Sequence, residues 1–392
     1  MDEHQKKRTM NILKKTFLAI LAVLVVLAIG GYIVLKKTFL QEFPELQGKP
    51  ETGKWYEVAP EGAVSADGSP WRAFFKKGTA NKFMVYFFGG GVSVDEYTAA
   101  RGRSVVSEGG FYSDNVKYQD YVATWGIGSQ DERNPFKDWS VLAIPYGCGD
   151  FHCGTGDFSY TSLEGEQKVL HHHGYTNYSG ALSKILPYIG QPEALLVCGY
   201  SAGGWGTSIL AEDVIAHFPN TNNVTVCVDG SLGLYKDWRF VAEHVWKAPA
   251  EITGRIVSDN IILDCLLSLH RDYKDRVKIL YGCSVRDEAL ANVQTYFDSK
   301  RNDKPTKVDG DVQQKNLKKF VKQLQDSIPS CGIFLWDDIV TQPKEALMQH
   351  TILLSSDFFT DRSGNGSFAK WIDDAVKGYT HSFGLDLVDK KY

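Results

Sequence analysis

Short runs of consecutive apolar residues recur along most of the chain, separated by segments with helical spacing. Runs that are apolar at successive positions are typical of strands in a parallel sheet whose two faces are covered by helices. Strands are expected at residues 83–88, 139–145, 194–198, 224–228 and 277–281, and helices at 178–189 and 208–217. Because strands that alternate with helices form right-handed βαβ units, the pattern predicts an α/β fold with a mostly parallel sheet flanked by helices.

Two segments depart from this alternation. Residues 301–328 are highly charged except for one stripe of apolar side chains, which predicts an inserted surface helix. The stripe consists of Leu317, Phe320, Val321, Leu324 and Ile328. Residues 38–70 are polar and rich in turn-forming prolines, so we expect a stalk that includes the first strands. A single α/β domain is then expected over 71–392, because no Pro/Gly/Ser-rich linker divides that part.

The longest apolar run lies near the N-terminus. Residues 17–35 form 19 positions without a charge, and lysines and an arginine cluster ahead of them. A cleaved signal peptide has a shorter apolar region and a small-residue cleavage site, and a buried core helix is the third reading. The pattern favours an uncleaved transmembrane signal anchor over 16–36, with residues 1–15 as a cytoplasmic tail. The remainder of the chain is then expected outside the cytoplasm, held at a cell membrane.

Charge is distributed unevenly between these two parts. Residues 1–37 carry seven Lys or Arg and two Asp or Glu, a balance of +5. Since the whole chain has a formal charge of −4, residues 38–392 carry −9. This outer part has no basic stripe and no block of Lys or Arg, so nucleic acid is not expected as a partner.

Cysteine and histidine spacing gives little support for a metal site. Cys148 and Cys153 are close enough for a short disulfide staple, whereas Cys198 and Cys227 lie inside apolar runs as small buried side chains. The chain has seven cysteines and no CxxC pair. The histidine triplet at 171–173 is the one metal-like feature, but consecutive histidines on a strand or helix cannot all face one ion. We therefore expect neither a metal nor an organic cofactor.

A nucleophile motif follows the apolar run at 194–198. The residues Gly199, Tyr200, Ser201, Ala202 and Gly203 match G-x-S-x-G, between an expected strand and an expected helix. In a nucleophile elbow the serine occupies a strained strand-to-helix turn, and small residues two positions before and after it let the backbone pass closely. The pattern predicts Ser201 as a nucleophile at a helix N-terminus, where developing negative charge is favoured.

Such a nucleophile requires hydrogen-bond donors for the oxyanion that forms during acyl transfer. One is the N–H of the residue after the serine, here Ala202. The others come from an earlier loop at a strand end, and Gly89, Gly90 and Gly91 follow the run at 83–88 in that manner. We expect Gly90 or Gly91 to complete an oxyanion hole with Ala202.

The order Ser, Asp or Glu, His along the chain locates the other partners. Asp287 and Glu288 come directly after the expected strand at 277–281, and Asp229 is the rival acid, at the end of the strand after the nucleophile. Candidate bases are His350, His381 and His270, of which His270 precedes the acid and breaks the order. Order alone favours His350 over His381.

An ordered series of motifs from about residue 55 to residue 378 resembles the pectin acetylesterase and Notum family of carboxylesterases. The resemblance implies an α/β-hydrolase fold and a serine esterase with Ser201, Asp287 and His350 as its triad. The series comprises the glycine loop at 89–91, Asn134-Pro135 with Trp139, the segment at 144–154, Gly174 with Asn177, Gly199 to Gly204, Asp-Gly-Ser at 229–231, Asp287 to Leu290, His350 to Leu353, and Trp371-Ile372.

Three features of the resemblance bear on the pocket. Family members commonly carry a Trp, and often a Cys, after the paired glycines, where this chain has Gly91, Val92 and Ser93. An extra Gly147 shifts the Pro-Tyr-Cys pattern. Asp150 and His152 match the family's Gly-Asp-x-His stretch, which would shape the site near the oxyanion loop or act as a structural brace.

The expected activity is hydrolysis of a carboxylic ester through an acyl-enzyme on Ser201, without metal or cofactor. The family covers acetyl esters on polysaccharides and a fatty acyl ester on a signalling protein. An acidic, membrane-anchored outer domain favours an acylated carbohydrate as substrate. The alternatives are a deacylase for longer acyl chains, which needs a deep apolar pocket, and a non-catalytic cell-surface binding protein on the same fold.

Overall fold

The structure is a computed structural model that describes residues 16–17, 20–21, 23–27, 29–31, 43–106, 108–362 and 366–392. The chain divides into two compact units, Met1–Glu42 and Phe43–Tyr392. In the first unit, the described residues are helical and expose apolar side chains such as Phe17 and Leu24. Across the described residues, no helix is both long and apolar enough to cross a membrane. Part of the anchor expected at 16–36, and all of the tail at 1–15, lies outside the described residues.

An eight-stranded sheet forms the centre of the second unit, in the order β1-β2-β4-β3-β7-β8-β9-β10. Strands β4 to β10 of this order run parallel, while β1 and β2 add an antiparallel edge. The strands are β1 (Trp55–Val58), β2 (Ala73–Lys76), β3 (Lys82–Phe87), β4 (Ser140–Ile144), β7 (Ala194–Tyr200), β8 (Asn223–Asp229), β9 (Val277–Ser284) and β10 (Gly332–Trp336). The parallel α/β arrangement expected from the apolar runs is therefore confirmed.

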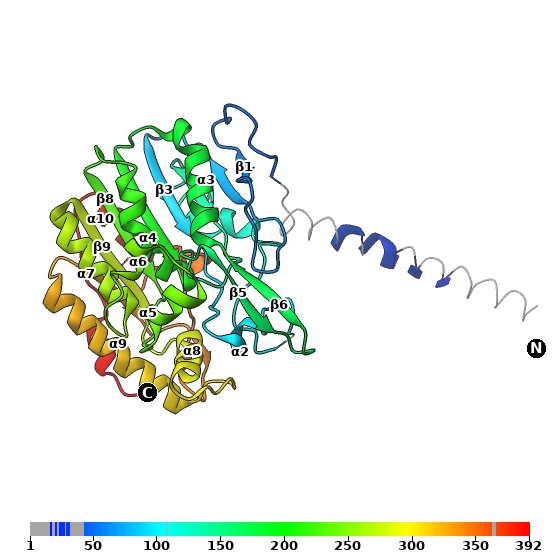
Figure 1. The fold of residues 1–392 in the computed structure, drawn as a ribbon. Coiled ribbons are helices and arrows are strands. Elements are labelled where there is room, and N and C mark those ends of the chain that lie inside the picture. The colour runs from blue at the N-terminus through cyan, green and yellow to red at the C-terminus, as the bar shows by residue number, and fades with distance from the viewer. Residues whose placement is uncertain are drawn as a thin grey trace, which may run out of the picture. The chain divides into compact units, whose positions relative to one another are not determined.

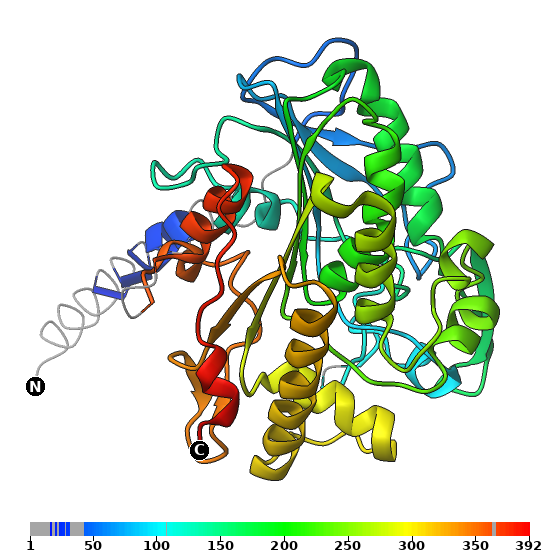
Figure 2. The same ribbon diagram turned by 90° about the vertical axis from the view of Figure 1, so that its left-hand side faces the viewer.

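Helices cover both faces of the sheet (Figures 1 and 2). Helices α3, α4 and α7 lie on one face, and α10 packs against β8 and β9 on the other. The longer helices are α3 (Gly174–Ile189), α4 (Ala202–Ala216), α7 (Ile261–Tyr273), α8 (Glu288–Ser299), α9 (Lys307–Ser327) and α10 (Phe368–Val376). The shorter helical segments include α2 (Glu96–Ala99), α5 (Trp238–Phe240) and α6 (Ala250–Thr253).

The charged stretch expected as a surface helix is α9. Its apolar stripe is buried at Leu317, Phe320, Val321 and Leu324, and Ile328 caps the helix end in a buried position. Thr306 begins the helix with a capping box, in which its side chain accepts from the Asp309 N–H. Helix α9 packs on α7 and α8, and its Phe320 ring meets the Tyr281 ring of β9 edge-on at 4.8 Å, so the helix also contacts the sheet directly.

Residues 43–70, the described part of the expected stalk with the first strands, contain β1. From Phe43 onward the chain belongs to the globular unit. The Phe43 ring stacks on Trp55 with centroids 5.8 Å apart and meets Phe74 edge-on at 5.6 Å. Burial of these aromatic rings ties the segment to β1 and β2, which polar composition alone does not indicate.

Cys148 and Cys153 do not form the short disulfide that their spacing allows. All seven cysteines are buried free thiols, Cys148 and Cys153 included. The Asn177 side-chain amide donates to Cys148 Sγ at 3.3 Å, while the Cys153 thiol donates to the Asp150 carbonyl at 3.0 Å. Each sulfur is therefore satisfied by a different neighbour, and the two cysteines brace the loop by hydrogen bonds.

The C-terminal segment covers the β10 edge of the sheet. Phe383 forms a parallel bridge with Phe334, donates its N–H to the Ile333 carbonyl at 2.7 Å and accepts from the Leu335 N–H at 3.1 Å. His381 lies in this segment, and its carbonyl accepts from the Trp371 indole at 2.9 Å. Residues 381–383 thus supply the hydrogen-bonding partners that an exposed edge strand lacks.

Candidate active site

Ser201 occupies the sharp turn between β7 and α4, as the motif predicts. Its φ of 53° and ψ of −131° are a strained conformation for a residue with a side chain. The Ser201 N–H donates to the Asp229 carbonyl at 2.8 Å, and the Ser231 hydroxyl donates to the Ser201 carbonyl at 2.7 Å. These bonds fix the backbone on both sides of the serine and offset the local strain.

The flanking glycines are required by close backbone approach. A Cβ on Gly203 would lie 2.1 Å from the Phe87 carbonyl oxygen at the end of β3. One on Gly199 would lie 2.3 Å from the Gly203 oxygen. Because no side chain fits at either position, helix α4 can approach the sheet closely enough to present Ser201 at the strand ends.

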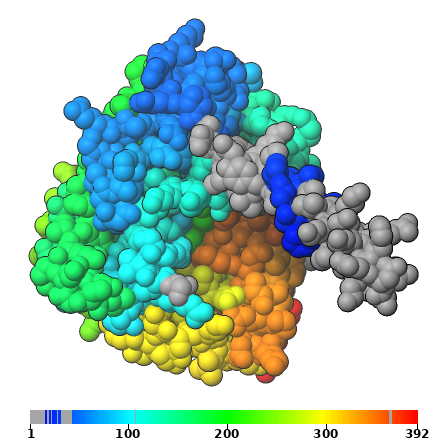
Figure 3. Space-filling view, turned by 90° about the vertical axis from the view of Figure 1, so that its right-hand side faces the viewer, coloured from blue at the N-terminus to red at the C-terminus, as the bar shows by residue number. Residues whose placement is uncertain are grey.

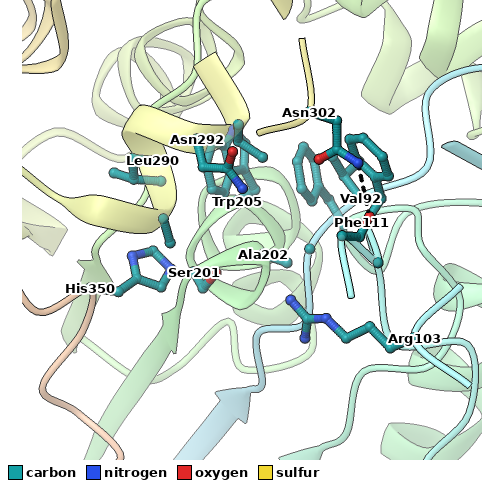
Figure 4. A pocket seen from close by; sticks show the side chains of 16 residues that line it. Val92, Arg103, Phe111, Ser201, Ala202, Trp205, Leu290, Asn292, Asn302 and His350 are labelled. Carbon is teal, nitrogen blue, oxygen red and sulfur yellow. Dashed lines mark hydrogen bonds between the residues drawn. The ribbon is translucent and has the colours of Figure 1, made fainter. Parts of the chain in front are cut away.

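His350 and Asp287 form the ion pair that the sequence predicted as a base and its acid. Nδ1 of His350 lies 2.8 Å from Oδ1 and 2.9 Å from Oδ2 of Asp287. Asp287 is fully buried at the N-terminus of α8, where its carboxylate also accepts from the Leu290 N–H at 2.9 Å. His350 follows the short strand β12 (Leu347–Met348), and its ring lies beside Ser201 (Figure 4).

The charges around His350 favour its protonated form. Burial lowers the pKa of the imidazole, but the carboxylates of Asp287 and Asp229 outweigh this effect and raise the pKa above its usual value. The Arg103 guanidinium opposes them. Burial also raises the pKa of Asp287, and the charge of His350 counteracts this rise. His350 is thus poised to hold a proton taken from a neighbouring hydroxyl.

Asp229, the rival acid, has a different position. Its Oδ2 accepts from the Ile352 and Leu353 N–H groups, each at 2.9 Å, and burial raises its pKa to about 7. Oδ1 has no hydrogen-bond partner among the described residues. Asp229 therefore holds the loop that follows His350, whereas Asp287 contacts the imidazole itself.

Arg286 is a supporting residue that sequence reasoning missed. Its side chain is completely buried and pairs with Asp311. The guanidinium also donates to the Ala346 and Lys307 carbonyls, each at 2.8 Å. Since Ala346 lies just ahead of β12, Arg286 connects the acid-bearing loop to the segment that carries His350.

The glycine loop passes directly over the nucleophile. A Cβ on Gly89 would lie 2.5 Å from Cβ of Ser201. Gly91 and Ala202 line the same cavity as Ser201, and the Ala202 N–H opens α4, where no intrahelical acceptor exists. Gly90 is buried against the Tyr146 ring and does not line the cavity. The geometry thus favours Gly91 over Gly90 as the residue that faces a substrate.

Asp150 and His152 lie behind this loop and do not line the cavity. Burial lowers the pKa of His152 to about 4, so the imidazole is neutral and its Nε2–H donates to the Phe88 carbonyl at 2.9 Å. The Asp150 carboxylate accepts from the backbone N–H groups of His152, Gly154 and Gly174. His152 thus braces Phe88, the residue ahead of the glycine loop, and Asp150 fixes the segment that carries His152.

The cavity beside Ser201 has a volume of about 140 Å³ (Figure 4). Trp205 and Phe151 form an aromatic wall, with parallel rings 4.7 Å apart. Val92 lines the cavity where the family resemblance led us to expect a larger side chain. The lining residues include Gly91, Val92, Arg103, Phe111, Phe151, Ala202, Trp205, Leu290, Asn292, Asn302 and His350.

A wider, polar groove adjoins the cavity, with a volume of about 730 Å³. The two spaces share Gly109, Ala289, Asn292, Asn302 and His350. Glu108, Glu288, Asp303 and Lys304 line the groove only. In the space-filling view, the surface is hollowed between segments coloured cyan, yellow and orange, which correspond to the parts of the chain that line these spaces (Figure 3). The reacting serine therefore lies between a small chamber and an open polar groove.

The comparisons with known proteins agree with this geometry. Residues 55–246 match the family model of pectinacetylesterases. The resemblance noted in the sequence is therefore confirmed. No curated protein matches the chain.

Among solved structures, the Wnt deacylase Notum from Drosophila is similar, with a TM-score of 0.57 and 15% sequence identity. The match covers 84% of this chain and 96% of the Notum chain. At this identity the similarity establishes a shared fold, a mostly parallel sheet flanked by helices. The matching family is one of carboxylic ester hydrolases.

The charge of Asp287 should be visible in the pH dependence of ester hydrolysis. A general base acts in its neutral form, so wild-type activity should decline as the pH falls through the raised pKa of His350. Asp287→Asn removes the main stabilising charge, which lowers that pKa and moves the acidic limb of kcat/KM to lower pH. The variant should also lose about 10⁴-fold in kcat, because an amide favours the wrong imidazole tautomer.

Asp298→Asn, on the same helix α8, is the matched control and should keep the wild-type pH profile. The measurement is kcat/KM for a soluble ester from pH 4.5 to 9. An acidic limb that stays in place in Asp287→Asn would show that another group is titrating.

Proposed function

We propose that this protein is a serine carboxylesterase that removes small acyl groups through an acyl-enzyme intermediate. The observation that supports this most directly is the placement of a strained serine beside a histidine–aspartate pair in a small cavity. A structural turn serine has no need of a buried carboxylate that orients a neighbouring imidazole.

In the proposed mechanism, Ser201 Oγ attacks the ester carbonyl and His350 takes its proton, while Asp287 keeps the imidazole in the required tautomer. The N–H groups of Ala202 and of Gly91, with Gly90 as the alternative donor, stabilise the tetrahedral oxyanion. Each such donor contributes about 3–4 kcal/mol to the transition state. The alcohol then leaves with the proton from His350, and water hydrolyses the acyl-serine with His350 again acting as base.

The size of the chamber supports a short acyl group. A cavity of about 150 Å³ accommodates a ligand the size of benzene, and the chamber here has about 140 Å³. An acetyl group fits this volume, whereas a long acyl chain would extend beyond it. Although the similar Notum structure is that of a deacylase, removal of long acyl chains is therefore the less favoured alternative for this protein.

The polar lining of the adjoining groove supports an ester substrate whose alcohol part is polar. Its walls carry carboxylate, ammonium and amide groups, which suit the hydroxyls of a carbohydrate better than an apolar leaving group. We accordingly propose acetyl esters on a polysaccharide as the substrate class. The same arrangement disfavours a non-catalytic binding protein, since nothing in carbohydrate binding requires the His350–Asp287 pair.

We further propose that the N-terminal apolar run is a signal anchor that places the catalytic domain outside the cytoplasm. Its support is the uncharged run at 17–35 with basic residues on both sides. The described residues of that stretch are helical, with apolar side chains exposed at Phe17, Ile20, Leu21, Val23, Leu24, Val25, Val26, Leu27 and Ile29. Exposed apolar patches of this kind favour contact with lipid over contact with water.

Acyl-chain selectivity is the most direct test of the proposed function. The full-length protein should hydrolyse p-nitrophenyl acetate and butyrate, and kcat/KM for the palmitate ester should be at least about 100-fold lower because the chamber is small. Ser201→Ala should lower kcat for every ester by about 10⁵-fold or more. It should also prevent labelling by a fluorophosphonate probe. A preference for palmitate would overturn the acetylesterase assignment, and an active, labelled Ser201→Ala would overturn the nucleophile.

The identity of the base is tested by two histidine variants. His350→Ala should cost nearly as much activity as Ser201→Ala, because members of a triad act as a unit. His381→Ala is the matched control and should retain wild-type turnover, since His381 lies in the segment that covers β10. Circular dichroism of both variants confirms folding, and the reverse ranking of activities would reassign the base.

Membrane topology is tested by adding protease to intact cells that express the chain with an epitope at each end. The C-terminal epitope should be lost and the N-terminal epitope retained, because the basic residues ahead of the run keep that end inside. Protection of the C-terminal epitope in intact cells, with digestion after detergent, would contradict the proposed orientation.

A further inference from the structure

A hairpin outside the main sheet brings together two histidines and an aspartate. Strands β5 (Gly156–Thr161) and β6 (Gln167–His172) pair in antiparallel fashion and project from the body of the domain (Figure 1). Asp157 on β5 is directly opposite His171 on β6, and His173 is the next residue along on the same face. None of the three lines the cavity or the groove at Ser201.

The alternation of side chains along β6 explains how the histidine triplet is divided. Residues 171 and 173 point to one face of the hairpin and residue 172 to the other. His172 is buried, and its Nδ1 hydrogen-bonds the Cys148 carbonyl at 2.7 Å. The objection that three consecutive histidines cannot face one ion therefore holds for His172 and does not apply to the other two.

The donor atoms of the remaining two histidines converge on one carboxylate oxygen. Nδ1 of His171 lies 2.7 Å from Oδ1 of Asp157, and Nε2 of His173 lies 3.0 Å from the same atom. One donor atom from each residue lies within 4.8 Å of the others. Ligands of a tetrahedral zinc ion, each about 2.0–2.1 Å from the metal, are about 3.3 Å apart, so small side-chain rotations suffice to admit an ion.

We propose that Asp157, His171 and His173 bind a divalent transition-metal ion of the zinc class. Two imidazole nitrogens and one carboxylate oxygen suit Zn²⁺, whereas Mg²⁺ and Ca²⁺ prefer oxygen ligands alone. The side chains are 30%, 25% and 53% exposed for His171, His173 and Asp157, so water can reach the ion and complete its coordination. On binding, each histidine presents a lone pair at the ligating nitrogen and carries its proton on the other.

Backbone hydrogen bonds hold His171 and the residue after His173 in place. The His171 N–H donates to the Ala66 carbonyl at 3.1 Å, which fixes this part of β6 against the turn at residues 65–69. His173 directly precedes α3, whose first residue, Gly174, donates its N–H to Asp150 at 2.8 Å. A bound ion would therefore join β5, β6 and the start of α3, and should stabilise the folded state by mass action.

The test uses the full-length protein, purified without a polyhistidine tag and treated with a chelator that is then removed. Calorimetric titration with Zn²⁺ should show one ion per chain, and the melting temperature should rise with Zn²⁺ concentration. Co²⁺ should give the visible absorption of a low-coordinate site with nitrogen ligands. His171→Ala and His173→Ala should each weaken Zn²⁺ binding by at least about tenfold, and Asp157→Asn should do the same.

His217→Ala, which removes an exposed histidine at the end of α4, is the matched control and should bind Zn²⁺ as the wild type does. His171→Gln serves as a second variant if alanine impairs folding, because its amide keeps a hydrogen bond to Asp157 and does not replace imidazole as a zinc ligand. Failure of the wild-type chain to bind Zn²⁺ at millimolar concentration, or unchanged binding in the His171 and His173 variants, would overturn the proposal. Ester hydrolysis reports on the separate site at Ser201, so the two proposals succeed or fail independently.

Discussion

Asp229 connects the parts of the active site that the chain order keeps apart. Its carbonyl accepts from the Ser201 N–H, and its carboxylate accepts from the N–H groups of Ile352 and Leu353, in the loop after His350. One residue at the end of β8 thus fixes the backbone of the nucleophile and the loop of the base. Such a double role requires burial, and burial in turn raises the pKa of its carboxyl to about 7. The elbow, the imidazole and the cavity between them all depend on this bond pattern.

Much of the fold followed from the apolar runs, because buried parallel strands carry an unambiguous signal. All five strands expected from that signal are present, with β7 buried along its entire length. The pattern missed β10, although this strand is a buried apolar run, and it also missed strands that are short or half-exposed. Strand β2 ends in a lysine, and β5 alternates between partly exposed and exposed residues, so neither forms a continuous apolar run. The aromatic contacts that draw Phe43 into the domain join segments distant in sequence, which periodicity does not detect.

The candidate site also contains residues that the sequence predicted and residues that it did not. Ser201 and the glycine loop carry local patterns, and the order of residues along the chain then pointed to Asp287 and His350, which the structure places together. The roles of Asp229, Arg286 and His152 depend on contacts with backbone groups many residues away, which have no sequence signature. The chain could not reveal that His171 and His173 share a partner either, since the hairpin register that places Asp157 opposite them is set by tertiary contacts.

The covering of β10 by residues 381–383 has a consequence for solubility. An uncovered β10 would offer a row of unpaired N–H and C=O groups on a strand made of Gly, Ile, Phe, Leu and Trp, with no charge to repel a neighbour. Such an edge would favour strand pairing between molecules. The last dozen residues thus act as a built-in shield against self-association, although they lie outside the cavity at Ser201.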